Sequence, residues 1–326
     1  MFSASNIHYE LSERTRGVGV GGVGAVHKFA LASGLVKAID ERVDVLKVHL
    51  PYHESDHVLN IAYNILSGGT CLEDIELLRN DEVYLDALGA HWIPDPTAAG
   101  DFCRRLKEED INALMDAFNE VRPRMWSQQP EEFLDEAKID ADGTLVETLA
   151  ECKEGMNISY QGTWGFHPLL VSLANTQEPL FLVNRGGNRP SSERASERLD
   201  QAIELCRRSG FKKVTLRGDT DFTQTKHLDR WDEQEVEFVF GMDAMPNVEG
   251  IAESLPRRAW RWASKYKAEK RAVIRMEFKS FVNALIRVPA QIIRQGRKTI
   301  YCLLAWNPWQ PVFLRGFDQL ATTMRC

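Results

Sequence analysis

The sequence of 326 residues lacks any stretch of about 20 uninterrupted apolar residues, so it predicts no transmembrane helix. Its N-terminus, MFSASNIHYELSERTR, also lacks the basic and then apolar layout of a secretory signal peptide. Hydrophobic residues make up 44% and charged residues 27% of the chain, as in soluble globular proteins. We therefore expect a cytoplasmic protein with two or more domains.

Cysteine is sparse, and its spacing excludes the CxxC units of common zinc and redox sites. No cysteine lies within four residues of another. The six are Cys71, Cys103, Cys152, Cys206, Cys302 and Cys326. In a reducing compartment we expect them to be small buried thiols.

Positive charge is scarce everywhere except near the C-terminus. Residues 257–326 carry 15 Lys and Arg against Glu269, Glu277 and Asp318, a net charge of +12. The rest of the chain has a net charge of −19, and the whole chain −7. A basic tail on an acidic body is typical of contact with a polyanion, although a solvated charged helix would have the same composition.

The first part of the chain predicts short helices over residues 24–125. Apolar residues recur there at helical spacing, as at Val58 and Ile61 and again at Ile111 and Leu114. After this region Pro123 and Pro130 mark a linker.

Beyond the linker the pattern predicts strands first and then alternating helices and strands. Three strands are expected in residues 137–149, 167–175 and 178–185, then a helix in 191–210, a strand in 211–219, a helix in 222–234 and a strand in 236–243. Gly143 is a candidate bulge in the first strand. This order predicts the α/β class, with a mixed sheet flanked by helices. Two or three basic amphipathic helices are expected after residue 257, interrupted by Pro289 and Pro308.

The glycines Gly19, Gly21 and Gly24 form a literal GxGxxG, and Asp40 lies near the distance of a ribose-binding acid. A dinucleotide site also needs a buried strand leading into the glycines and a βαβ unit after them. The lead-in SERTRGV is polar and charged, and no βαβ unit follows. We therefore interpret the glycines as a turn before a helix.

The segment His53-Glu54-Ser55-Asp56-His57 is a literal HExxH. On a helix, His53 and His57 would share a face and could ligate zinc, with Glu54 as general base. Pro51 places the segment in the first turn of a helix, where acidic side chains are ordinary partners of the helix dipole. A zinc peptidase is therefore the weaker interpretation of this segment.

Two acidic segments lie at predicted strand ends: Asp140 and Asp142 in IDADGT, and Asp219 and Asp221 in LRGDTDF. If the two strands are neighbours, Asp142 and Asp219 converge at one edge of the sheet. Two close carboxylates repel each other when ionised, so such a pair favours the binding of divalent cations. Two bound Mg²⁺ ions can promote phosphodiester cleavage. The alternative is that these acids only cap the turns that follow the strands.

At these residues the sequence resembles the DDE transposases of bacterial insertion sequences, in the subgroup called transposase DDE domain group 1. The resemblance is carried by VHLPYHESDHVLNIAYNILSGGTCLEDIELLRNDEVYLDALGA, IPDPTAAGDFCRRL, KIDADGTLVET, KEGMNISYQGTWGFHPLLVSLANT, EPLFLVNRGGNRPS and TLRGDTDFT. In the tail it continues in KAEKRAVIRMEFKSFVNALIRVP and LLAWNPWQPVF. It covers nearly the whole chain.

The resemblance implies an RNase H-like core, with residues 138–240 supplying most of it. It also implies a triad of two aspartates and one glutamate that binds two divalent metals, Mg²⁺ or Mn²⁺. Such enzymes cut double-stranded DNA at the terminal repeats of the element and join it to target DNA. Asp142 and Asp219 are the predicted first and second acids, with Asp140 and Asp221 as their alternatives.

The third acid of the triad has no counterpart in this chain. In the family a β-rich stretch and a helix with Asn-Gln-Glu-Asn character lie between the second aspartate and the C-terminal ending. In this chain the segment that follows the second aspartate leads almost directly into the C-terminal ending, near residues 256–265. Glu269 and Glu277 are the only later glutamates, and both lie in the tail-like segment. We infer an internal deletion of roughly domain size, on the order of 100 residues.

The chain is therefore predicted to have three parts. Residues 1–130 are expected to form a helical region that contacts DNA ends and a second copy of the chain in a homodimer. Residues 131–256 would form a partial catalytic core, and residues 257–326 a basic helical segment after the deletion junction.

The predicted function is metal-dependent DNA cleavage and strand transfer in transposition, defective because the third acid is missing. The alternative is a DNA-binding remnant without catalysis. In the basic segment Trp260, Trp262 and Tyr266 interleave with cations, and would either stack on DNA or pack in a helix core. The predicted DNA-binding residues are Arg257, Arg258, Arg261, Lys265, Lys267, Lys270 and Arg271.

Overall fold

The computed structural model describes residues 16–150 and 153–241, the backbone of residues 290–295 and 298–303, and a few positions between 246 and 314. The chain divides into two compact units, one of residues Met1–Ala117 with Arg275–Cys326, and one of residues Phe118–Ile274. Within the described residues, no helix combines the length and the hydropathy that a membrane span needs.

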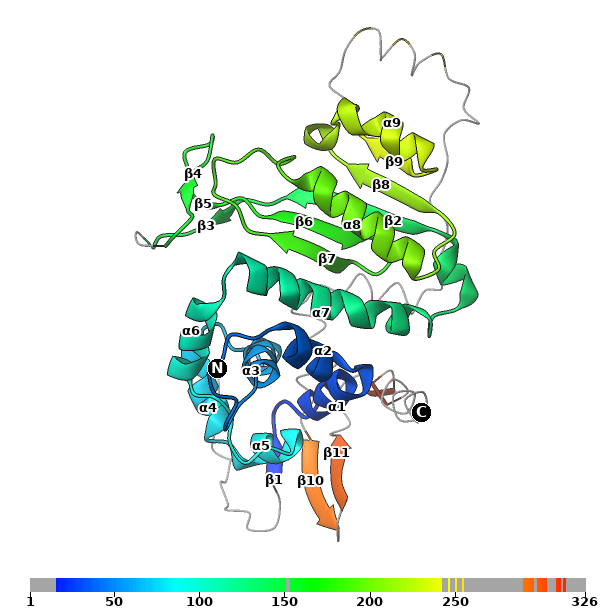
Figure 1. Ribbon diagram of the computed structural model, residues 1–326. Coiled ribbons are helices and arrows are strands. Elements are labelled where there is room, and N and C mark those ends of the chain that lie inside the picture. Colours follow the sequence, from blue (N-terminus) through cyan, green and yellow to red (C-terminus); the bar gives the residue numbers. More distant parts are fainter. Residues whose placement is uncertain are drawn as a thin grey trace, which may run out of the picture. The chain divides into compact units, whose positions relative to one another are not determined.

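The first unit is mainly helical, as predicted (Figure 1). Its helices are α1 (Val23–Ser33), α2 (Leu35–Arg42), α3 (Glu54–Leu66), η1 (Leu72–Asp74), α4 (Ile75–Arg79), α5 (Glu82–Leu88), α6 (Pro96–Arg105) and the start of α7 (Glu108–Trp126). Buried apolar side chains such as Val23, Ile75 and Tyr84 form its core. Local signals set several boundaries: Asp81 and Asp95 cap α5 and α6, and Gly34 ends α1 at a φ of 83°.

A small antiparallel sheet completes the first unit and corrects the prediction of an all-helical tail. Strands β10 (Ala290–Gln295) and β11 (Lys298–Leu303) pair with each other, and β10 also pairs with β1 (Arg16–Val18). The segment AQIIRQGRKTIYCL was predicted as basic helix, but it forms a hairpin. Its apolar residues fit a strand period as well as a helical one, so the pairing partner decides.

A second correction concerns the predicted linker, because α7 continues through Pro123 to Trp126. In the second unit the helix is joined to strand β7 (Glu178–Val183). Asn119 Nδ2 donates to the carbonyl of Leu180 at 3.0 Å, and the Arg122 guanidinium forms an ion pair with Glu178. A short helix η2 (Glu131–Asp135) follows.

The second unit is built on a five-stranded mixed sheet in the order β7-β6-β2-β8-β9. Its other strands are β2 (Ala137–Gly143), β6 (Leu169–Leu173), β8 (Val214–Gly218) and β9 (Glu237–Phe240). The pairs β2–β6 and β6–β7 are antiparallel, whereas β2–β8 and β8–β9 are parallel. Helices α8 (Ala195–Arg208) and α9 (Thr225–Glu233) form the two crossovers. This is the RNase H-like arrangement that the resemblance predicts.

Alternation of side chains explains how the sheet is buried. In β2 the residues Ala137, Ile139 and Ala141 are buried, while Lys138 and Asp140 between them are half-buried. Helix α8 lies across the sheet in Figure 1 and contacts β2, β6, β7 and β8. The charged residues of β2 are therefore carried on the face opposite to its buried residues.

The first predicted strand is broken after Gly143. The register with β6 runs through Gly143 without a bulge, and a Cβ at this residue would lie 2.8 Å from Nε2 of His167, so a larger residue would displace that side chain. The chain then forms a separate antiparallel sheet of β3 (Val146–Glu147), β5 (Trp164–Phe166) and β4 (Asn157–Ile158) before it returns to β6.

Candidate active site at the ends of strands β2 and β8

The two predicted aspartates come from neighbouring strands, as the acid-pair hypothesis required. In the parallel pair β2–β8, Asp140 is the register partner of Arg217. Asp142 lies two residues beyond Asp140 in β2, and Asp219 directly follows β8. Both acids therefore lie just past the last register pair of these two neighbouring strands.

Asp140 forms an ion pair with Arg217. Its two oxygens accept hydrogen bonds from Nε and Nη2 of Arg217 at 2.6 and 2.7 Å, a two-pronged ion pair. The hydrogen bonds that Arg217 donates to the Asp140 carboxylate raise the pKa of Arg217. Asp142, one strand period further on, accepts at Oδ1 from the backbone N–H of Gly143 at 2.8 Å. Its Oδ2 has no hydrogen-bond partner among the described residues.

The second acidic pair is arranged in a turn. Asp219 caps the short helix η3 (Thr220–Phe222), because its Oδ1 accepts from the backbone N–H of Asp221 at 3.0 Å. The capping alternative that the sequence left open is therefore real for one of its oxygens. Asp221 accepts at Oδ2 from the Ser191 hydroxyl at 2.7 Å. All three of Asp142, Asp219 and Asp221 are exposed to solvent.

A polar cavity of about 500 Å³ opens beside these acids. Asp219 and Asp221 line it together with Gly143, the neighbour of Asp142. Its other lining residues are Leu145, Ser159, Tyr160, Gln161, His167, Gly187, Asn188, Arg189, Pro190, Ser191 and Ser192. Hydroxyl, amide, imidazole and guanidinium groups thus line the cavity together with the two carboxylates, which suits a polar ligand better than an apolar one.

The wall of this cavity is held by a buried cation. Arg185 is 7% exposed and donates through Nε to the carbonyl of His167 at 2.9 Å. Its Nη1 donates to the carbonyls of Pro190, Ser191 and Glu193 at 2.8–3.0 Å. Burial lowers the pKa of Arg185, and the Glu193 carboxylate opposes that effect. The guanidinium therefore fixes the loop that presents Ser191 to Asp221.

Comparison with known protein families decides the class of this site. The model of the family described as transposase DDE domain group 1 matches residues 20–281, most of the chain. The chain belongs to this family. Both aspartate pairs lie inside the matched region, so the acidic site belongs to a transposase domain.

Among solved structures, the chain is similar to a piggyBac transposase, described as a cryo-EM structure of its synaptic complex with hairpin DNA. The sequence identity is 10%, and the alignment covers 94% of this chain and 67% of that chain, with a TM-score of 0.30. A search of the curated proteins found no match.

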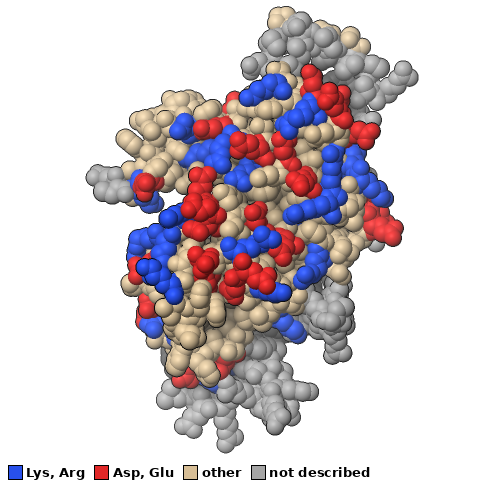
Figure 2. Space-filling model, viewed as in Figure 1, with Lys and Arg blue, Asp and Glu red and all other residues tan. Residues whose placement is uncertain are grey.

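The predicted DNA-binding residues lie outside the described residues. This holds for all seven cations from Arg257 to Arg271, for the aromatic residues between them, and for Glu269 and Glu277. On the face drawn in Figure 2, the described residues of both units carry basic and acidic side chains interspersed.

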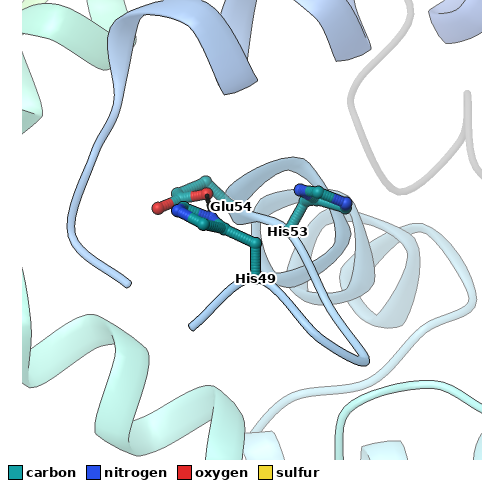
Figure 3. A group of neighbouring side chains, drawn as sticks. All are labelled: His49, His53 and Glu54. Carbon is teal, nitrogen blue, oxygen red and sulfur yellow. Dashed lines mark hydrogen bonds and ion pairs between the residues drawn. The ribbon is translucent and has the colours of Figure 1, made fainter. Parts of the chain in front are cut away.

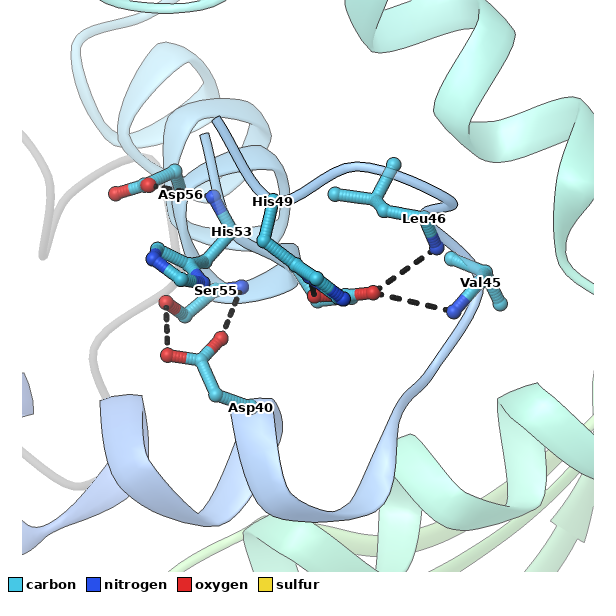
Figure 4. A network of polar contacts seen from close by, with 8 residues as sticks. Asp40, Val45, Leu46, His49, His53, Ser55 and Asp56 are labelled. Atoms are coloured by element: carbon cyan, nitrogen blue, oxygen red, sulfur yellow. Dashed lines mark hydrogen bonds and ion pairs between the residues drawn. The ribbon is translucent and has the colours of Figure 1, made fainter. Parts of the chain in front are cut away.

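The HExxH segment does not form the zinc peptidase site that its motif would predict. His57 is 5% exposed, and its ring stacks on Phe102 with centroids 4.7 Å apart. Glu54 is 1% exposed, and its Oε1 accepts from the backbone N–H groups of Val45 and Leu46 (Figure 4). Because His57 is buried against Phe102, the pair of His53 and His57 does not present two accessible zinc ligands with Glu54 as general base.

The GxGxxG segment is a turn before a helix, as interpreted. Helix α1 begins at Val23, and β1 before it pairs antiparallel with β10 rather than forming a βαβ unit. Gly24 allows close packing, because a Cβ there would lie 2.9 Å from the carbonyl oxygen of Ala87. Asp40, the candidate ribose ligand, instead accepts from the backbone N–H and the hydroxyl of Ser55 at 2.9 and 3.0 Å.

Several residues of interest gave no signal in the sequence. Arg185 and Ser191 support the acidic turn only because the loop between β7 and α8 folds back onto η3. His49 lies beside Glu54, although Pro51 excludes a helix that would align it with His53.

Proposed function

We propose that this chain is a DDE transposase of an insertion sequence in which Asp142 and Asp219 are the first two acids of the catalytic triad. The observation that supports the proposal is the parallel pairing of β2 and β8, whose last register pair, Asp140 with Arg217, lies two residues before Asp142 and Asp219. The ion pair of Asp140 with Arg217 favours Asp142 over its alternative. The hydrogen bond from Ser191 to Asp221 favours Asp219 in the same way.

The donor set fits a hard divalent cation. Asp142 and Asp219 each keep one carboxylate oxygen without a hydrogen-bond partner in the described part of the chain, and both are exposed beside a polar cavity. Carboxylate oxygens are the ligands that Mg²⁺ and Mn²⁺ prefer. When bound, such a cation supplies positive charge that stabilises the attacking and leaving oxygens of a phosphodiester. The chain's own part would be to carry the two carboxylates at the ends of neighbouring strands and to fix the cavity wall through Arg185.

We further propose that complete transposition is lost. The sequence beyond Asp219 contains no run with the Asn-Gln-Glu-Asn character of the family's third acid, so the proposed site supplies two charged ligands where the family supplies three. Two carboxylates bind one ion weakly and leave the second ion without support. Strand transfer at the rate of an intact relative would contradict this proposal.

Double-stranded DNA is the proposed partner, at the terminal repeats of the element and at the target. The basic segment from Arg257 to Arg271 is the proposed phosphate contact, and its net positive charge supports this. A homodimer and a cytoplasmic location, where bacterial DNA is accessible, belong to the same proposal.

The experiment uses the purified full chain with supercoiled DNA that carries the parent element's ends, in Mg²⁺ or Mn²⁺. Nicking that Asp142→Asn and Asp219→Asn both abolish, while the exposed control Asp229→Asn retains it, would support a working two-aspartate site. Asp140→Asn tests the alternative acid, and we expect it to keep most of the nicking.

The second candidate is a DNA-binding remnant, favoured by the missing third acid and the retained basic segment. It predicts salt-sensitive binding of the element's ends with no nicking in either metal. Replacing Arg257, Arg258 and Arg261 by alanine should then weaken binding of all DNA sequences about equally, because phosphate contacts carry no sequence information.

A further inference from the structure

Three potential metal ligands meet at the start of helix α3. His49, His53 and Glu54 each offer one nitrogen or oxygen atom, and these atoms all lie within 4.8 Å of one another. Figure 3 shows the side chains together, with His53 and Glu54 at the beginning of the helix and His49 in the loop before it. This group differs from the HExxH pair, because His49 takes the place of His57.

The fold of the loop brings His49 to this position. Its ring stacks beside that of His53, with centroids 5.7 Å apart and planes 19° apart. Its Nδ1 lies 3.2 Å from Oε2 of Glu54. Both histidines are exposed, with 45% of the His49 side chain accessible, so a cation could reach them from solvent.

Glu54 is the fixed member of the group. Its Oε1 accepts from the backbone N–H groups of Val45 at 3.1 Å and Leu46 at 3.0 Å, which leaves Oε2 facing His49. The helix that carries Glu54 is anchored as well, because Ser55 donates twice to Asp40 (Figure 4). A buried carboxylate held in this way aims one oxygen without a rearrangement of the backbone.

We propose that His49, His53 and Glu54 form a binding site for a divalent transition-metal cation of the zinc class. Imidazole nitrogens with one carboxylate are the ligands that Zn²⁺, Co²⁺ and Ni²⁺ prefer, whereas Mg²⁺ prefers oxygen alone. Bonds to Zn²⁺ are about 2.0–2.2 Å long, so binding would bring the two exposed histidine rings closer to Oε2 of Glu54. Three protein ligands leave a fourth position for water.

The bound cation would have a structural role in the first unit. Glu54 already joins the loop of residues 43–53 to α3 through Val45 and Leu46. A cation shared with His49 and His53 would close the same loop at its other end. The site uses none of the acids proposed for transposition, so either proposal can fail without the other.

The test measures zinc retained by the full chain after metal stripping, incubation with Zn²⁺ and desalting, and zinc affinity by calorimetry. We expect one zinc ion per chain in the parent. His49→Ala and His53→Ala should each weaken binding by about 10-fold or more. His91→Ala, which removes an exposed histidine of the same unit, should leave it unchanged, as should Asp142→Asn with Asp219→Asn.

Glu54→Gln keeps the size and the acceptor oxygen of the anchor while removing its charge, and should weaken zinc binding in a chain whose circular dichroism is unchanged. The absorption bands of Co²⁺ in the visible range should report nitrogen and oxygen ligands in the parent and disappear in His49→Ala. No zinc bound by a folded parent, or binding that His49→Ala and His53→Ala leave intact, would overturn the proposal.

Discussion

At the scale of single residues, burial decides the chemistry of side chains that look equivalent in the sequence. Cys206 on α8 is fully buried, and burial raises its pKa to about 12. Cys71 and Cys103 are exposed. The expectation of buried thiols is therefore confirmed for Cys206 and wrong for Cys71 and Cys103, because cysteine is small enough to be tolerated at helix surfaces.

We expect iodoacetamide at about pH 8 to modify Cys71 and Cys103 in the native protein, because the reagent reaches these exposed thiols, and to leave Cys206 unmodified, because burial keeps that thiol both inaccessible and protonated. Peptide mass spectrometry after short exposure measures this. In denaturant all three should react. Modification of native Cys206 as fast as Cys103 would show that α8 does not shield it.

His57 makes the first unit sensitive to acid. Burial lowers its pKa below the ordinary value of 6.5, against the opposing carboxylates of Asp56 and Glu54. The unfolded chain therefore binds a proton at a higher pH than the folded chain does. Its contribution to stability is complete above pH 6.5 and is lost as the pH falls through the lower folded value.

We expect His57→Phe, which preserves the stack on Phe102, to reduce the drop in Tm between about pH 7.5 and about pH 5.5. Melting curves in buffer with a chelator measure this without metal binding. His91→Phe, at an exposed position, should keep the parent's drop. An equal drop in His57→Phe would place the acid sensitivity elsewhere.

At the scale of elements, close contacts between backbones decide where the small sheet beside the cavity can form. A Cβ at Gly165 in β5 would lie 2.1 Å from the carbonyl oxygen of Val146 in β3. Backbone atoms cannot move aside as flexible side chains do. The three strands around residue 165 therefore depend on glycine at that position.

We expect Gly165→Ala to destabilise the second unit by about 1–3 kcal/mol, because β3 and β5 must separate. Gly19→Ala is the control, since a Cβ there meets nothing within 4 Å, and it should change stability by no more than about 0.5 kcal/mol. Urea denaturation followed by fluorescence measures both. Equal midpoints would contradict the contact.

The junction of α7 and β7 depends on a largely buried ion pair. Arg122 contacts Glu178, donates to Oδ1 of Asn119 and to the carbonyl of Pro179, and is 16% exposed. Trp126 Nε1 donates to the same carboxylate at 3.2 Å. This network joins the helix that crosses Pro123 to the edge of the five-stranded sheet.

We expect Arg122→Ala to cost roughly 2–4 kcal/mol, since it leaves the half-buried Glu178 carboxylate without its cationic partner. Arg104→Ala removes an exposed pair with Asp101 and should cost less than about 1 kcal/mol. Denaturant midpoints measure the difference. Combining Arg122→Met with Glu178→Gln should recover part of the loss, which a purely steric role of Arg122 would not allow.

At the scale of the whole molecule, the sheet order makes β2 the centre of the second unit. It pairs with β6 on one side and β8 on the other, and Ala137 and Ile139 are fully buried. Strand β9 pairs with β8 alone among the strands that the structure describes. The proposed first acid is therefore carried by the most enclosed strand.

We expect native-state hydrogen exchange to be slowest at Ile139 and Ala141, faster in β9 and fastest in β3 and β4. Mass spectrometry of peptides, or NMR, measures this order. Exchange of β2 as fast as that of β9 would mean that the sheet opens as a unit from its centre.

The sequence determined the second unit best, because its signals are local. Alternating apolar residues predicted β2, β6, β7, β8 and β9, and the helical period predicted α8 and α9. Start and stop signals were less reliable: α8 begins at Ala195 behind Arg194, not at the predicted serines. Family motifs identified the transposase domain, since they join segments along the whole chain.

Only the tertiary structure decided which side chains meet. The acids at Asp140 and Asp142 are equivalent in the sequence, and the β2–β8 register gives one of them to Arg217. His49 reaches Glu54 because a loop turns back, which no periodicity encodes. Strand β10 pairs with β11, which is near it in the chain, and also with β1, which is far away in the chain. Local propensity fixes elements within a few residues, whereas strand register and loop closure depend on contacts between distant segments.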